Sequence, residues 1–180
     1  MRLHRVLTLA LLTTLAATAA FAQEENSKAR DENRESVRRV LASAGKLSDV
    51  DATFRQSTKE PYNFVATMTD LANSESLEVV VRVSSTDTIS LRIYPHYKNG
   101  YINVGKLKNA NALMRKLLNY NDTNFLFWGA DEEGDIFSAY SFTMESGFPE
   151  EAMVIVLRSV RSTDRFVGEL RPFIDGSAAA

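Results

Sequence analysis

Apolar residues recur with a helical period in three segments of this 180-residue chain. In residues 32–44 they fall at positions i, i+3, i+4 and i+7, which is the spacing of one face of a helix. A second stripe covers residues 107–121, and a third follows Pro149, where two acidic residues suit the start of a helix. The pattern predicts three helices, and the polar residues 162–164 predict a kink or a restart in the last one.

Elsewhere the apolar period changes from 3.6 to 2, as expected for strands with one buried face. In residues 77–83 the odd positions are apolar, while Glu78 and Arg82 occupy the opposite face. Pro95 is expected to end the strand that begins at Thr88. The predicted strands span residues 63–69, 77–83, 88–94, 124–129 and 136–142.

Short turns separate most neighbouring strands, which favours antiparallel pairing. The predicted fold class is α+β in the order α-β-β-β-α-β-β-α, with a largely antiparallel five-stranded sheet and helices packed mainly on one face. The chain has no Cys, so the hydrophobic core must hold this domain together without disulfides.

The N-terminal segment has the pattern of a secretory signal peptide. Two arginines precede a short apolar core, and Ala20-Phe21-Ala22 supplies small residues for cleavage between Ala22 and Gln23. The apolar core is shorter than the roughly 20 residues that a membrane span requires. We therefore expect a periplasmic or secreted protein without a stable membrane anchor after cleavage. The predicted organisation is a signal peptide (1–22), a flexible leader (23–31), one domain (32–175) and a frayed tail (176–180).

Charge and motifs argue against several classes of function. Removal of the two arginines with the signal peptide would move the formal net charge from −2 to about −4, which disfavours nucleic acid as a partner. His96 is the one histidine after the signal, and no Cys nucleophile, G-x-S-x-G elbow or nucleotide-binding glycine loop accompanies it. The sequence therefore predicts neither an enzyme nor a bound cofactor.

Acidic residues cluster around Gly134, from Asp131 to Asp135. Several carboxylates on one loop can bind Ca²⁺, but this spacing lacks the full ligand series of an EF-hand. A solvated hairpin turn between two strands is the favoured interpretation, and no metal site is predicted.

Large aromatic residues mark both faces of the last two predicted strands, so some of them are expected on an open face of the sheet. Exposed apolar patches mark partner surfaces, and Trp and Tyr are enriched at binding hot spots. The candidate partner-binding residues are Phe127, Trp128 and Tyr140. The alternative is that the N-terminal helix covers the second face of the sheet.

Three pieces of the chain carry a family resemblance: Leu117-Leu118-x-x-Asn121, the Asp131–Asp135 turn and the helix after Pro149. With the order of elements over residues 62–173, they resemble the YbjN-type family, described as bacterial sensory transduction regulators with a fold like that of type III secretion chaperones. The resemblance implies a small interaction protein, often a dimer, without an enzymatic site. The predicted signal peptide departs from the cytoplasmic role of such chaperones.

The leading hypothesis is an exported, non-enzymatic interaction or regulatory module of the bacterial envelope. Its partner would be a protein, with a homodimer as one form of that association. The alternative is a periplasmic small-ligand or lipid-binding protein that uses a cleft between the sheet and the helices.

Overall fold

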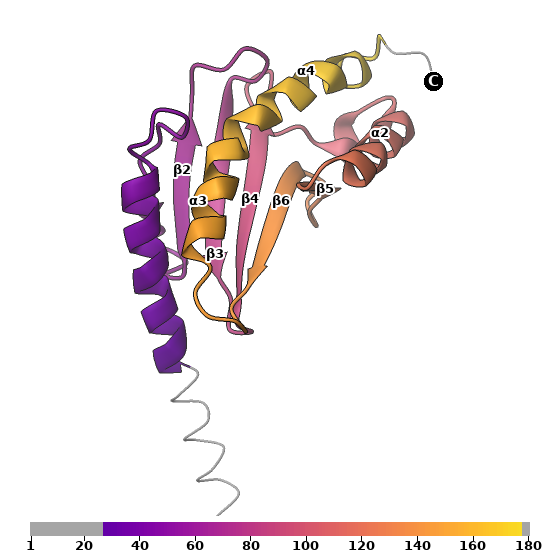
Figure 1. Cartoon of the computed structure of the whole chain (residues 1–180). Coiled ribbons are helices and arrows are strands. Elements are labelled where there is room, and N and C mark those ends of the chain that lie inside the picture. Colours follow the sequence, from indigo (N-terminus) through magenta and orange to yellow (C-terminus); the bar gives the residue numbers. More distant parts are fainter. Residues whose placement is uncertain (1–26, 178–180) are drawn as a thin grey trace, which may run out of the picture.

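A six-stranded antiparallel sheet carries a single layer of helices (Figure 1). This computed structural model describes residues 27–177, so the predicted signal peptide, its Ala22–Gln23 cleavage site and residues 178–180 of the tail lie outside the described part. The predicted α+β class is confirmed, with one strand more than expected. The extra strand, β1, has only two residues, too few for an alternating pattern to reveal it.

All neighbouring strands pair antiparallel, in the order β1-β2-β3-β4-β6-β5. The register places Val79 opposite Ile93, and Leu91 opposite Tyr140, so the apolar positions share the face beneath the helices. The strands are β1 (Arg55–Gln56), β2 (Asn63–Met68), β3 (Ser76–Val83), β4 (Thr88–His96), β5 (Phe127–Ala130) and β6 (Ile136–Thr143).

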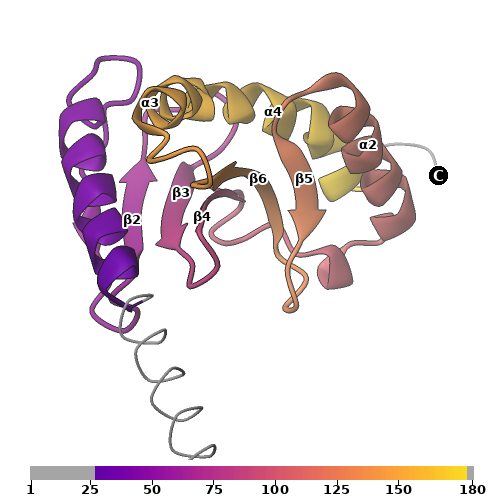
Figure 2. The ribbon, with the colours of Figure 1, turned by 60° about the horizontal axis from the view of Figure 1, so that its bottom comes forward.

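The helices lie along one face of the sheet, as predicted. Figure 2 shows α3 and α4 above the sheet, the N-terminal helix beside β2 and α2 beside β5, while none of these four helices lies below the sheet. The last helix does restart, through one turn of 3-10 helix at the predicted position. The helices are the N-terminal helix (27–44), η1 (Val104–Lys106), α2 (Ala110–Thr123), α3 (Glu150–Ser159), η2 (Val160–Ser162) and α4 (Thr163–Ile174).

The N-terminal helix begins earlier than its apolar pattern predicts. Residues 27–31 are helical, so the predicted flexible leader does not extend over them. Arg30 donates to the carbonyl of Val83 at 2.9 Å and lies 3.5 Å above the ring of Tyr62. Asp31 accepts a hydrogen bond from the Tyr62 hydroxyl at 2.9 Å. These polar contacts, which an apolar pattern does not report, hold the first turns against the sheet.

Pro95 does not end β4, contrary to the prediction. The strand continues to His96, and Pro95 lies opposite Leu77 of β3. By the register, odd-numbered residues of β4 direct their backbone groups towards β6, but the pairing with β6 stops at Ile93. The missing N–H of Pro95 therefore faces a side where no ladder bond is lost.

Two hydrophobic clusters fill the space between the layers. One joins the N-terminal helix and α3 to β2, β3 and β4. The other joins α2 and α4 around Trp128 and Ile136. The β2–β3 loop is bound to α4 through Asp164, which is buried. The Asp164 carboxylate accepts hydrogen bonds from three successive backbone N–H groups of the loop, those of Ala72, Asn73 and Ser74, at 3.0, 3.0 and 2.7 Å.

The same loop packs closely on α4 beyond Asp164. A Cβ on Gly168 would stand only 2.6 Å from Oδ1 of the Asn73 side chain, which occupies this space instead. Arg171 donates to the carbonyl of Asn73 at 2.5 Å. Asp164, Gly168 and Arg171 thus form one face of α4 that holds this loop.

Asp164→Ala is expected to lower the free energy of unfolding by about 3 kcal/mol, because three backbone N–H groups lose a charged acceptor. Urea denaturation at pH 7 measures the change. The matched control is Asp122→Ala, which removes an exposed carboxylate of α2 and should cost less than about 0.5 kcal/mol. Equal losses in the two variants would contradict the role given to Asp164.

The pH dependence gives a second readout of the same contact. Burial raises the pKa of Asp164, but hydrogen bonds from Ser74 and Asn73 outweigh burial and bring the pKa below its usual value. The stabilisation is therefore complete above the unfolded pKa of about 3.9, and it is lost as the pH falls through the lower folded pKa. The difference between the native protein and Asp164→Asn should shrink only below about pH 4.

Candidate functional site

The helix-free face of the sheet carries a continuous line of aromatic rings. The line starts at the end of β4, crosses β6 and finishes on β5. We call it the aromatic stripe, and it consists of His96, Tyr101, Tyr94, Arg92, Phe137 and Phe127.

Strand alternation places most of the stripe. In β4, Arg92 and Tyr94 point away from the helices, while Leu91 and Ile93 are buried beneath them. The register sets Arg92 opposite Ala139, which places the open-face residues of β4 next to those of β6. Tyr101 joins from the following loop, where it forms an isolated bridge with His96.

The rings contact one another in sequence. The Tyr94 ring centroid lies 5.8 Å from that of Tyr101 and 5.7 Å from that of Phe137. Phe137 lies 6.4 Å from Phe127, and the Arg92 guanidinium stands 4.5 Å above the Phe137 ring. These separations fit edge-to-face and cation–π packing. Each ring is therefore held in place by its neighbours.

Gly129 makes room for the end of the stripe. It lies opposite Phe137 in the β5–β6 register. A Cβ at this position would stand 3.0 Å from the Phe127 ring and 3.3 Å from the Phe137 ring. The absence of a side chain thus lets the two phenyl rings approach each other across the strand.

Polar groups border the rings. The Tyr101 hydroxyl donates to Glu78 at 3.1 Å, and burial, helped by the Glu78 carboxylate, raises the pKa of Tyr101 to about 12. Burial likewise raises the pKa of Tyr94, although Arg92, which donates to the Tyr94 hydroxyl at 3.2 Å, opposes the shift. Both phenols therefore stay neutral at physiological pH and offer hydroxyl groups at the surface.

Of the three predicted partner-binding residues, Phe127 lies on the open face and is 56% exposed. Tyr140 lies on the helix-covered face, half-buried, with its ring 4.8 Å from that of Phe142. It also contacts the exposed Phe125, at 6.1 Å between ring centroids. The sequence prediction missed Tyr94 and Tyr101, although the outward position of Tyr94 follows from the alternation in β4.

The prediction that Trp128 belongs to a partner surface is wrong. Its side chain is only 2% exposed and packs between Tyr120 and Phe166, at 5.7 and 5.9 Å between ring centroids. Alternation sends Trp128 inward because its neighbour Phe127 points outward. A Trp128→Ala change would therefore empty part of the core rather than test an interface.

Asn121 fixes the outer edge of the strand that carries Trp128. Its side-chain Nδ2 donates to the Trp128 carbonyl at 3.0 Å, and its Oδ1 accepts from the Trp128 N–H at 2.6 Å. One side chain of α2 thus takes the place of a neighbouring strand at this residue. This explains in physical terms why an Asn stands four residues after Leu117 in the segment that leads into β5.

The acidic segment from Asp131 to Asp135 is the hairpin turn between β5 and β6, as interpreted from the sequence. Asp131 Oδ1 accepts from the Asp135 N–H at 2.8 Å, and Gly134 takes a positive φ of 85°. Asn103 donates to Asp135 Oδ1 at 2.7 Å. Among the described side chains, no group of three His, Asp or Glu residues is arranged to hold a metal ion. The two aspartates thus shape the turn.

His96 belongs to the aromatic surface. Its ring lies 4.3 Å from that of Tyr101. Its Nε2 is buried and has no hydrogen-bond partner among residues 27–177. Neither a nucleophile nor an orienting acid contacts the imidazole in that range, so this histidine acts as a ring in the stripe.

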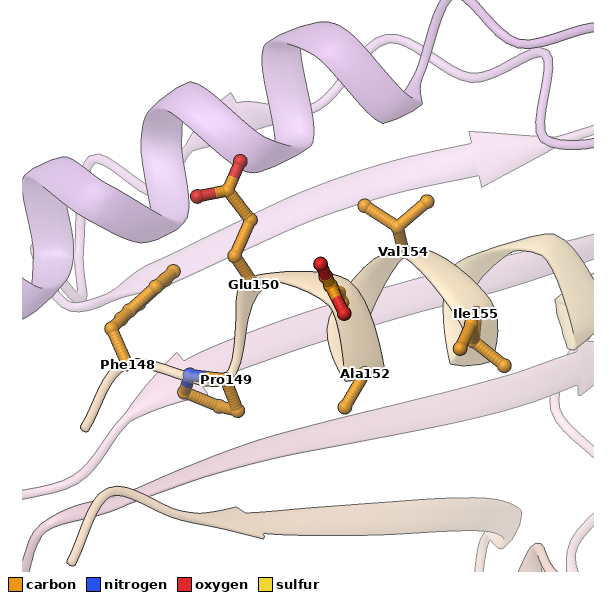
Figure 3. A pocket seen from close by; sticks show the side chains of 7 residues that line it. Phe148, Pro149, Glu150, Ala152, Val154 and Ile155 are labelled. Atoms are coloured by element: carbon orange, nitrogen blue, oxygen red, sulfur yellow. The ribbon is translucent and has the colours of Figure 1, made fainter. Parts of the chain in front are cut away.

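A shallow apolar groove follows the start of α3. It has a volume of about 920 Å³ and is lined by Phe148, Pro149, Ala152, Val154 and Ile155 with two glutamates. Figure 3 shows Val154 on the side towards the N-terminal helix and Ile155 on the opposite side. Ile155 is 67% exposed, so the groove presents an apolar side chain to solvent.

Comparison with known proteins adds no relative. No protein-family model matches the chain, and no curated protein is significantly similar to it. Within residues 27–177, no helix is both long and apolar enough to cross a bilayer.

Asn121→Ala is expected to lower the free energy of unfolding by about 2 kcal/mol, because the Trp128 N–H and carbonyl lose their partner at the sheet edge. Hydrogen exchange should also show loss of protection at the Trp128 amide. Asn119→Ala, two residues earlier and exposed on the same helix, is the control and should change neither quantity. Retained protection of Trp128 in Asn121→Ala would overturn the edge-blocking role.

Proposed function

We propose that this chain is an exported, non-enzymatic interaction or regulatory module of the bacterial envelope, and that its aromatic stripe binds a protein partner. The observation that carries the proposal is the continuous line of rings on a sheet face that no described helix covers. Its exported location rests on the signal-peptide pattern of residues 1–22.

The composition of the stripe suits a protein interface. Tyr and Arg are among the residues that dominate binding energy at interfaces, and Tyr94, Tyr101 and Arg92 contribute both types here. The rings already contact one another in the free protein. Binding therefore immobilises few side chains, which lowers its entropic cost. Glu78 and Arg82 add charges of both signs at the rim, where they can set orientation.

The family resemblance points in the same direction. The YbjN-type family resembles this chain in the Leu117–Asn121 segment, the Asp131–Asp135 turn and the helix after Pro149, and it implies a small interaction protein that is often a dimer. A second copy of the chain is accordingly one partner to test. Nothing in the resemblance brings an enzymatic site or a cofactor.

Phe127→Ala is expected to weaken partner capture and self-association at least tenfold, because it removes an exposed ring from the end of the stripe. The matched control is Phe125→Ala. Phe125 is 58% exposed, much like Phe127, but it contacts Tyr140 on the other face instead of the stripe. Affinity capture from the native envelope and sedimentation equilibrium measure the two forms of binding.

Both variants should keep the circular dichroism spectrum of the native protein, since neither ring belongs to the buried core. Arg92→Ala provides a second stripe variant, in which the guanidinium above Phe137 is lost. Capture that survives both Phe127→Ala and Arg92→Ala would count against the stripe. Loss of capture in Phe125→Ala alone would indicate that the interface lies on the other side of β5.

A small-ligand or lipid-binding protein is the second candidate, and the apolar groove at the start of α3 favours it. In that case Ile155→Asp should remove a lipid that co-purifies with the native protein, because a carboxylate there would have to be desolvated. Native mass spectrometry reads the bound mass directly. Leu118→Asp, an exposed leucine of α2, is the control. A native protein that carries no added mass would speak against this alternative.

A further inference from the structure

A polar cleft of about 630 Å³ opens at the β1 edge of the sheet, away from the aromatic stripe. It lies between the loop that follows the N-terminal helix and the end of β2. The side chains that matter for its chemistry are Lys46, Asp51, Thr53, Arg55, Thr67 and Thr69. Its volume falls in the range of about 300–1,000 Å³ that is usual for small-molecule sites.

The cleft exists because β1 pairs with β2 at only two positions. Arg55 lies opposite Val65 and Gln56 opposite Phe64, and no further pair precedes them. Ser57 N–H donates to the carbonyl of Asn63, so odd-numbered residues of β2 direct their backbone groups towards this edge. The N–H of Thr67 therefore points to the cleft side, beyond the last β1 pair, and it bonds to no loop carbonyl within residues 27–177.

The opposite wall is a fixed loop. The Ala52 N–H donates to the Gly45 carbonyl at 3.0 Å, and a Cβ on Gly45 would stand 2.2 Å from the Ala52 carbonyl oxygen. Arg161 bridges the two walls, since it donates to the carbonyl of Val50 at 3.2 Å and to that of Thr69 at 3.0 Å. The cleft is thus formed before any ligand arrives.

The charges in the cleft favour an anion. Within residues 27–177, the side chains of Lys46 and Arg55 make no ion pair, hydrogen bond or ring contact, whereas the acid in the cleft, Asp51, faces Arg161 at 3.7 Å. Within the described residues, two cations without a partner therefore stand beside an acid that already pairs with Arg161, in a chain whose net charge is −2. The hydroxyls of Thr53 and Thr67 add donors that can bond to oxyanion oxygens, whereas the Thr69 hydroxyl already donates to Asp70 at 3.4 Å.

We propose that this cleft binds an oxyanion group, the phosphate or carboxylate of a small molecule. Arg55 supplies a planar fork of donors that matches such a group, and Lys46 supplies a second positive charge. The Thr67 N–H and the hydroxyls of Thr53 and Thr67 complete a set of donors around it. The proposal is independent of the aromatic stripe, which lies on the face of the sheet and uses none of these residues.

Calorimetric titration of the purified protein with inorganic phosphate, and separately with succinate, tests the proposal at low ionic strength. Saturable binding of at least one of them with a Kd of about 1 mM or tighter is expected. Arg55→Gln should weaken it at least tenfold, and Lys46→Met should weaken it to a smaller extent. Added KCl should weaken it as well, since the attraction is between charges.

The matched control is Arg82→Gln, which removes one positive charge from an exposed arginine on the open face of the sheet. It should change the affinity less than twofold. In amide NMR spectra, phosphate or succinate should shift Thr67 and its cleft neighbours and leave the stripe residues unmoved. Comparison of the affinity for phosphate with the affinity for succinate then identifies the preferred oxyanion.

Two results would overturn the proposal. One is the absence of saturable binding of both anions in the native protein. The other is an equal loss of anion affinity in Arg82→Gln and Arg55→Gln, which would mean that net charge alone accounts for the binding. All variants alter exposed side chains, so unchanged unfolding curves should confirm that the fold is intact.

Discussion

One layer of helices on one face of the sheet is the constraint from which the other features follow. Strand alternation sends every second side chain to the face without helices, and those side chains must meet water or one another. In β3 and β4 the outward positions include the exposed Arg82 and Arg92 and the half-buried Glu78. Towards β6 and β5 the outward positions become aromatic, and there the rings cover each other.

The extent of that mutual cover is visible in Phe137. It is only 7% exposed although no described helix lies over it, because Arg92, Tyr94 and Phe127 surround its ring. The stripe thus limits its own apolar exposure and leaves Phe127 and Tyr101 as its exposed large rings. A surface built in this way exposes little apolar area and still presents ordered apolar groups.

The sequence predicted the sheet well where one side of a strand is mostly apolar. Residues 77–83 and 136–142 match β3 and β6 to within one residue at each end because their inward positions face helices throughout. The prediction failed at Trp128, because both Phe127 and Trp128 are large and apolar. Alternation separates two such residues onto opposite faces, but only the packing of α2 and α4 decides which face is covered.

Other features lay beyond any local pattern. Tyr101 reaches the stripe from a loop, through a bridge to His96 that sequence periodicity does not encode. The cleft at β1 depends on where a two-residue strand stops pairing, and the first turns of the N-terminal helix depend on polar contacts with Tyr62. Such features follow from tertiary contacts between segments far apart in the chain.

The amide of Asn121 has a consequence for how copies of this chain can assemble. An incoming β-strand would need the outward N–H and carbonyl groups of β5, and those of Trp128 are already taken. At the far edge, β1 offers two residues, one of them a charged arginine. Runaway polymerisation through lateral strand exchange, the route to fibrils, is thereby disfavoured at both ends of the sheet. The broad surfaces of the sheet and of the helix layer are not blocked in this way.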